Sequence, residues 1–165
     1  MAVTPLDNPV WYALTGPHAH FATGQGKARH YPRAIAPFSA IEEPTPAAYT
    51  DLAADLPDQT EARLFRPENE RPPPAWETIS ARPIIQMVLD GSQLADRVNA
   101  ETEIVPLGPA DVPEMLALVE TARPGPFASR TIELGTYVGV RNGGAGRLIA
   151  MGGLQRAPCS LKALI

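Results

Sequence analysis

Residues 103–153 read EIVPLGPADVPEMLALVETARPGPFASRTIELGTYVGVRNGGAGRLIAMGG, and the order of patterns in this stretch decides the fold. The short apolar run at 103–107 is typical of a strand. Apolar residues then recur at the spacing of one helix face, namely Val112, Met115, Leu116 and Val119, and the helix must end before Pro124. Two β-rich runs follow at 136–141 and 148–151. The sequence therefore predicts the order strand, helix, loop, strand, strand.

Local signals refine the turn and the helix start in this stretch. Asn142-Gly143-Gly144 separates the two β-rich runs, and an Asn-Gly pair between strands is a hairpin signal. The glycine-rich run at 142–146 would have to open a helix to bind phosphate, and a strand-like segment follows it instead. We therefore predict a hairpin turn. Asp111 and Glu114 have the spacing of a capping box at the expected helix start, and Pro113 lies in the first turn, where its missing N–H costs little.

A second apolar region occupies residues 1–90 and is joined to the first by a mostly small or polar stretch at 91–102, which predicts a linker. Its expected elements are helices at Trp11–Leu14 and after Thr45-Pro46, strands within Phe21–Ile41, at Ala62–Arg66 and at Ile84–Leu89, and a proline-rich surface loop at Arg71–Ala75. The 19 prolines favour short elements. We predict an N-terminal module over 1–90, a linker over 91–102 and a second unit over 103–165.

Composition excludes several classes of function. The net charge is -4 and the basic residues are scattered, so the chain lacks the electrostatic footprint of a nucleic-acid-binding protein. No apolar stretch approaches the ~20 residues that span a bilayer. Residues 1–8 lack the pattern of a signal peptide, and the single cysteine, Cys159, excludes an internal disulfide and a thiolate-based zinc site. We expect a cytoplasmic protein that binds neither nucleic acid nor membrane.

The order of elements resembles the opening of a GNAT-superfamily N-acetyltransferase. Ile104–Leu107 and Asp111–Leu118 are similar to its first strand and first helix. Pro126-Phe127, Arg130-Thr131 and Leu134–Gly139 are similar to the loop and second strand of one subgroup, and Arg147–Gly153 is similar to the third strand. Asp7–Trp11 and Gln86–Val88 resemble the N-terminal part of the same subgroup. The resemblance covers about residues 5 to 153. It implies an α/β fold with a mixed sheet, in which an extra N-terminal α/β module precedes a truncated acyltransferase-like domain.

The resemblance implies acetyl transfer from acetyl-CoA, as co-substrate, to an amine of a small molecule or peptide. Such an enzyme is an acyltransferase that transfers groups other than aminoacyl groups, and it uses no metal. In the family, an Arg/Gln-x-x-Gly-x-Gly/Ala loop opens a helix that holds the pyrophosphate. From about Leu154 this sequence departs from that pattern, so no cofactor-binding residue is assigned. A frameshift or truncated product and a genuine short form both remain open. The alternative function is an inactive fragment or binding module without the acetyl-CoA site.

Candidate site residues come from the loop and second strand, and no catalytic residue is assigned. The substrate-side candidates are Phe127, Arg130, Glu133 and Tyr137. Acetyl transfer needs a base for the amine and a proton donor for the departing thiolate, and glutamate and tyrosine can serve these roles. The alternative, which we favour, is that Tyr137 packs in the sheet while Arg130 and Glu133 are solvated. An unpaired apolar strand edge at about 148–153 further predicts marginal stability or self-association.

Weaker patterns elsewhere favour structural interpretations. His18, His20 and His30 have a crude metal-ligand spacing, but nearby carboxylates are absent, so loop histidines are favoured and no metal site is assigned. Gly24-Gln25-Gly26 is expected to form a flexible turn. Trp11 and Trp76 are expected to anchor a core or an interface between domains.

Overall fold

The computed structural model describes residues 5–56, 61–86, 103–143, 146–155 and 163–164, and these form two compact units. Within the described residues, the first unit contains 5–33, 37–56 and 61–86, and the second contains Ala34–Ala36 and all of the residues from 103 onward. Both units combine helices with antiparallel strands, so the predicted mixed α/β class is confirmed. The expected linker at 91–102 lies outside the described residues. None of the described helices has the length and apolar character needed to cross a membrane.

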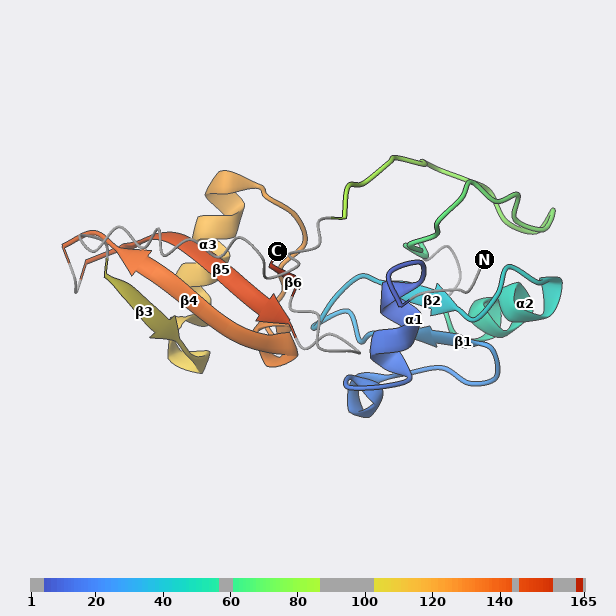
Figure 1. The fold of residues 1–165 in the computed structure, drawn as a ribbon, viewed down its shortest axis with the longest axis horizontal. Coiled ribbons are helices and arrows are strands. Elements are labelled where there is room, and N and C mark those ends of the chain that lie inside the picture. Colours follow the sequence, from blue (N-terminus) through green and yellow to red (C-terminus); the bar gives the residue numbers. More distant parts are fainter. Residues whose placement is uncertain (1–4, 57–60, 87–102, 144–145, 156–162, 165) are drawn as a thin grey trace, which may run out of the picture. The chain divides into compact units, whose positions relative to one another are not determined.

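The first unit is a small two-stranded sheet with short helices (Figure 1). Its elements are α1 (Pro9–Leu14), η1 (Ala19–Phe21), β1 (Ala28–His30), β2 (Ser39–Ile41) and α2 (Pro46–Asp55). The strands β1 and β2 pair antiparallel, with Ala28 opposite Ile41. Both predicted helices are therefore confirmed, and the stretch expected to hold strands contains two short ones.

The helix α2 starts where its capping signal predicts and covers the small sheet. The Thr45 hydroxyl oxygen accepts a hydrogen bond from the Ala48 amide at 3.3 Å, which satisfies one of the free donors at the helix start. One face of α2, formed by Ala48, Tyr49 and Leu52, is buried against Ala28 and Ile41. This cluster is the core of the first unit.

The turn predicted around residues 24–26 is hydrogen-bonded to α2. The Gln25 amide donates to the Asp55 carboxylate at 3.0 Å, and the Lys27 amide donates to the Asp51 carboxylate at 2.8 Å. Gly26 has a φ of +58°, which favours glycine, and a Cβ there would lie 2.4 Å from Asp51 Oδ2. Two aspartates one helical turn apart therefore fix this turn.

Residues 61–86 contain no strand, so the strands predicted at 62–66 and 84–89 are wrong over their described residues. The five prolines of this segment lie beside and between the two runs, at 67, 72–74 and 83, where they limit the length of any strand. Ile84 and Ile85 are 61% and 90% exposed, so this apolar run does not enter a core. Residues 87–89 lie outside the described residues. The proline-rich stretch at 71–75 has no regular structure, as predicted.

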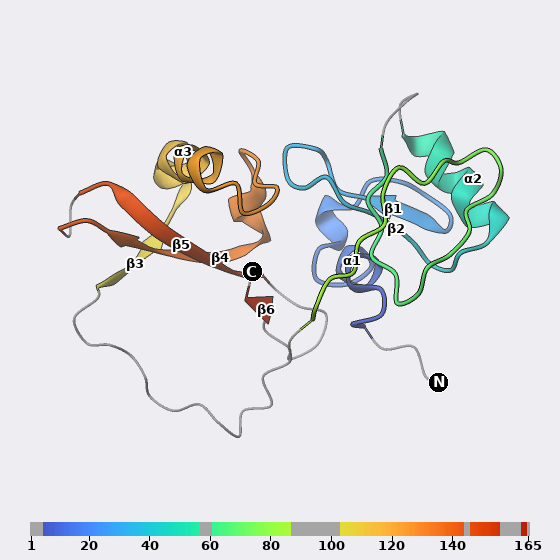
Figure 2. The ribbon, with the colours of Figure 1, turned by 90° about the horizontal axis from the view of Figure 1, so that it is seen from above.

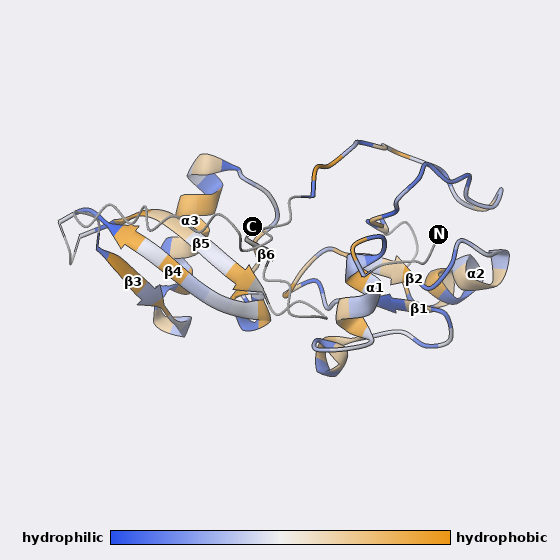
Figure 3. Cartoon of the chain, viewed as in Figure 1, coloured by the Kyte–Doolittle hydropathy of each residue, from blue (hydrophilic) through white to orange (hydrophobic). Residues whose placement is uncertain are grey.

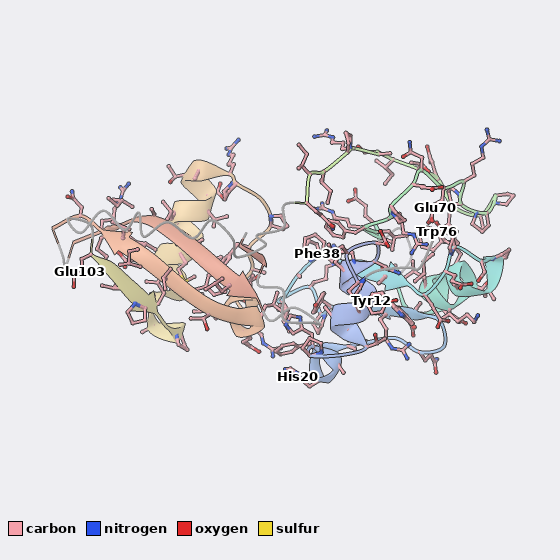
Figure 4. All side chains as sticks on the ribbon, viewed as in Figure 1. Tyr12, His20, Phe38, Glu70, Trp76 and Glu103 are labelled. Atoms are coloured by element: carbon pink, nitrogen blue, oxygen red, sulfur yellow. The ribbon has the colours of Figure 1, made fainter. Side chains whose placement is uncertain are left out.

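Side chains rather than a strand ladder hold this segment to the first unit. The Tyr49 hydroxyl donates to Glu70 at 2.5 Å, and Arg66 donates to Glu70 at 2.9 Å and to the Ile41 carbonyl at 3.3 Å. Trp76 packs edge-on against Tyr49, with ring centroids 5.6 Å apart. Glu70 and Trp76 both lie beside α2 in Figure 4. Trp76 is thus a core anchor of the first unit, whereas Trp11 is half-buried under the guanidinium of Arg29.

The second unit has the predicted order of elements. These are β3 (Ile104–Leu107), η2 (Pro109–Asp111), α3 (Val112–Ala122), η3 (Thr131–Leu134), β4 (Gly135–Arg141), β5 (Leu148–Gln155) and β6 (Ala163–Leu164). The sheet runs β3-β4-β5-β6 with antiparallel neighbours, and α3 lies on one of its faces (Figure 2). The hairpin is confirmed: the Asn142 amide donates to the Arg147 carbonyl at 3.0 Å, and Gly143 has a φ of +66°.

The core of the second unit lies between α3 and the sheet. Leu107, Met115, Tyr137 and Leu148 form its buried cluster. Gly139 lies between two of these residues, and a Cβ there would be 2.5 Å from the Leu148 side chain and 3.0 Å from that of Leu107. In Figure 3, α3 and β3 carry apolar colour over part of their length. The helix face predicted from spacing is therefore correct in its centre, Met115, which is fully buried.

The opposite face of the sheet is more open. A shallow apolar hollow is lined by residues of β3, β4 and β5, including Ile104, Val138 and Val140. Ile104 and Ile149 are 56% and 51% exposed. The strand β6 pairs with Leu154 and Gln155 at the end of β5, so within the described chain the outer edge of β5 from 148 to 153 lacks a strand partner. The predicted self-association through this edge stays a prediction.

Candidate functional site

The substrate-side candidates lie on the path from the end of α3 into β4, and they separate into two pairs. Phe127 belongs to the loop after α3, Arg130 is the N-cap of η3, Glu133 lies within η3, and Tyr137 lies within β4. The structure brings Phe127 to Tyr137 and brings Arg130 to Glu133. The two pairs have different surroundings and therefore different chemical capacities.

Phe127 and Tyr137 form an aromatic contact inside the helix–sheet core. Their ring centroids are 5.7 Å apart at an interplanar angle of 82°, which is the edge-to-face arrangement that aromatic rings prefer. Tyr137 is 7% exposed, and its ring covers Gly153 on the neighbouring strand, where a Cβ would lie 2.5 Å from the ring. Tyr137 therefore packs in the sheet, as the favoured alternative had it.

Arg130 and Glu133 form a bidentate ion pair at the surface. Arg130 Nε lies 2.6 Å from Glu133 Oε1, and Arg130 Nη2 lies 2.7 Å from Glu133 Oε2. Their side chains are 50% and 37% exposed. The hydrogen bond to Glu133, followed by its charge, raises the pKa of the Arg130 guanidinium above its ordinary value. Because both carboxylate oxygens accept from the guanidinium, Glu133 in this arrangement is better suited to recognition than to taking a proton.

The acidic residues at the start of α3 do not form the predicted capping box, which is a correction. Asp111 makes no side-chain cap bond into α3 and instead accepts from the Gly108 amide at 2.8 Å. Arg141, at the end of β4, donates to Asp111 at 2.5 Å and to Glu114 at 2.6 Å. These hydrogen bonds, that with Glu114 foremost, raise the pKa of Arg141. Arg141 was missed by sequence reasoning because both of its partners lie far away along the chain.

Thr131 is a further residue that sequence reasoning missed. It is 6% exposed, and its hydroxyl donates to the Ile35 carbonyl at 2.5 Å while accepting from the Ala128 amide at 2.8 Å. It lies between Arg130 and Glu133 in sequence, so it holds the segment that carries the exposed ion pair. No sequence signal links Thr131 to Ile35, because 96 residues separate them.

The histidines occupy separate environments. His18 is buried, with Nδ1 2.7 Å from the Tyr31 hydroxyl, whereas His20 is exposed (labelled in Figure 4) and contacts Phe21 with the two rings tilted by 44°. His30 Nδ1 lies 3.2 Å from the Tyr31 carbonyl oxygen. Among the described residues, no three side chains of the metal-binding types come together.

Comparison with known proteins places this geometry in a family. No protein-family model and no curated protein matches the sequence. A crystal structure from Novosphingobium aromaticivorans, assigned to the GNAT family of acetyltransferases, does match, with a TM-score of 0.71 and 34% sequence identity. The match covers 98% of this chain and 71% of that chain. Identity at this level over nearly the whole sequence extends beyond a shared fold, and the chain belongs to the GNAT family.

Proposed function

We propose that this chain transfers an acetyl group from acetyl-CoA to a primary amine of a small molecule or peptide. The observation that carries the proposal is the 34% identity with a GNAT-family structure over 98% of the chain. In such a reaction the amine nitrogen forms a bond to the thioester carbonyl carbon, and the carbon–sulfur bond breaks to release coenzyme A. The ammonium form of the acceptor must lose a proton, and the departing thiolate must gain one.

Among the described residues, we find no binding site for the pyrophosphate of the coenzyme. A helix start that binds an anion needs free N–H groups and no opposing charge. The N-cap of α3 is Asp111, whose carboxylate would repel a phosphate, and the Thr45 hydroxyl already caps α2. We therefore assign no described residue to acetyl-CoA.

We assign the acceptor side of the site to Arg130 and Glu133, bordered by Phe127. Their exposure and their place on the loop before β4 support this assignment. An exposed carboxylate beside a guanidinium offers contacts of both signs, to the ammonium of an acceptor and to a carboxylate that the acceptor carries. Tyr137 supports Phe127 through the core contact described above. The reaction fits a cytoplasmic location, which the acidic composition and the single cysteine favour.

The acceptor assignment is tested by the double variant Arg130→Ala/Glu133→Ala. We expect the KM for the amine acceptor to rise at least severalfold while the KM for acetyl-CoA is unchanged. The matched control is Glu61→Ala/Arg63→Ala, which removes another exposed ion pair, with side chains each 53% exposed, from the first unit. Equal acceptor kinetics in the double variant and the parent chain would remove Arg130 and Glu133 from the site.

A binding module that pairs with a second chain is the second candidate function. The observation that favours it is the exposed apolar face of the sheet, together with the edge of β5 that lacks a strand partner in the described chain. Such an edge is a template for strand addition. Sedimentation of the purified chain is the test: dimers that Ile149→Lys converts to monomers support pairing through this strand. A monomer at high concentration contradicts it.

A further inference from the structure

A short piece of the N-terminal sequence is built into the second unit. Ala34–Ala36 belongs to this unit by its contacts, although the rest of the unit follows much later in the chain. Ile35 is completely buried and Ala36 is 4% exposed. Ala34 is exposed, so Ile35 and Ala36 are the residues of this segment that join the packing of the unit.

This segment binds the candidate acceptor loop through two consecutive carbonyl groups. The Ala34 carbonyl accepts from the Arg130 amide at 2.8 Å, and the Ile35 carbonyl accepts from the Thr131 hydroxyl at 2.5 Å. The same hydroxyl accepts from the Ala128 amide at 2.8 Å. The Thr131 hydroxyl therefore uses its one donor on the Ile35 carbonyl and one of its two lone pairs on the Ala128 amide.

These bonds fix the backbone from which the exposed ion pair projects. The loop after α3 has no regular structure between Arg123 and Arg130, and its local hydrogen bonds join Ala128 to Thr131 at its end. The Arg130 amide is held by Ala34, and the Arg130 carbonyl accepts from the Glu133 amide at 3.0 Å. The Arg130 and Glu133 side chains consequently start from backbone atoms whose positions depend on the clamp, by which we mean Ala34, Ile35 and Thr131.

We infer that Thr131 is a positioning residue, which works with the carbonyls of Ala34 and Ile35 to orient Arg130 and Glu133 toward the acceptor. The expected effect on acceptor binding rests on the proposed function. The expected effect on the position of the loop rests on the hydrogen bonds alone. Thr131 does not touch the acceptor, because it is buried. Removing the Thr131 hydroxyl would leave the Ile35 carbonyl without a donor, which is costly for a buried group. Its removal should therefore loosen the loop.

The test compares Thr131→Val, Thr131→Ser and Thr121→Val in the full chain. Valine keeps the shape of threonine and removes the hydroxyl, whereas serine keeps the hydroxyl. Thr121 donates to the Ala117 carbonyl on the exposed side of α3, so Thr121→Val is the matched control. Hydrogen exchange is measured at the Arg130 and Ala128 amides, followed by the KM for the amine acceptor and for acetyl-CoA.

We expect Thr131→Val to accelerate exchange at Arg130 about tenfold or more, the factor that corresponds to losing one buried hydrogen bond. The serine variant and the Thr121→Val control should exchange like the parent chain. We also expect Thr131→Val to raise the acceptor KM with little change in the KM for acetyl-CoA. In the parent chain, the Arg130 amide should exchange much more slowly than that of Gly125 in the exposed part of the loop, a comparison that holds even if Thr131→Val fails to fold.

Three results would overturn the inference. Exchange at Arg130 as fast as at Gly125 in the parent chain, or unchanged in Thr131→Val, refutes the clamp. Faster exchange with an unchanged acceptor KM refutes its role in acceptor binding while leaving the proposed function intact. If the parent chain transfers no acetyl group, the proposed function fails, and the exchange comparison alone decides whether the clamp exists.

Discussion

Truncation of Met115 to alanine removes the side chain on which the packing of α3 against the sheet is centred. Met115 is fully buried and contacts a cluster that contains Leu107, Tyr137 and Leu148. Ile104, on β3 of the same sheet, is 56% exposed on the opposite face. The two residues therefore provide a matched pair of truncations, one in the core and one on the open face.

The expected losses follow from burial. A buried methionine replaced by alanine typically costs about 2–5 kcal/mol, because the lost transfer free energy is joined by a cavity. At about 3 kcal/mol, and with a urea dependence of about 1.5 kcal/mol per molar, the midpoint should fall by about 2 M. Ile104→Ala removes a side chain that is already half in water and leaves no cavity, so its cost should be about 1 kcal/mol.

Urea titration followed by far-UV circular dichroism is the suitable assay, because Trp11 and Trp76 both lie in the first unit and tryptophan emission reports on that unit. A loss for Met115→Ala that exceeds the loss for Ile104→Ala by about 2 kcal/mol supports a core on one face of the sheet. Equal losses would refute the reasoning, since they would mean that both faces are covered to the same extent.

Three further predictions concern the first unit. Thr45→Ala removes the cap of α2 and should cost about 1 kcal/mol by tryptophan-monitored urea unfolding, whereas Thr50→Ala on the exposed side should be neutral. Gly26→Ala should cost about 1–2 kcal/mol in the same assay because of its positive φ, and a neutral effect would contradict the tethered turn. Burial raises the pKa of Tyr31 and, together with the Glu70 hydrogen bond, that of Tyr49. Their contribution to stability is complete below about pH 10 and lost above it, so urea midpoints should fall from pH 9 to 12, and a flat profile would count against buried phenols.

Elements with strong local signals could be predicted from the sequence. Thr45-Pro46 begins a helix, and Asn142-Gly143 forms the turn of a hairpin. Both were predictable because each signal acts on backbone groups within a few residues. The run at 62–66 is strand-like in composition, yet the structure gives it a single backbone bond to β2, from the Ser39 amide to the Arg63 carbonyl. Whether a β-rich run pairs depends on the partner strand, and that information is not local.

In the candidate site too, local features could be predicted from the sequence and long-range contacts could not. The sequence predicted which residues border the loop before β4, and it favoured a packed Tyr137, which the structure confirms. It did not indicate that Arg130 and Glu133 neutralise each other, and it had no signal for the contact of Ile35 with Thr131. Long-range hydrogen bonds to backbone carbonyls leave no trace in residue type, since any residue can supply a carbonyl.

The most direct test of the proposed acetyl transfer is a calorimetric titration of the full chain with acetyl-CoA, with coenzyme A alongside. The proposed function predicts binding of both ligands with a Kd of about 1 µM to 1 mM, the usual range for enzyme substrates. Folded protein that binds neither ligand would contradict acetyl transfer by this chain, and it would favour the binding module.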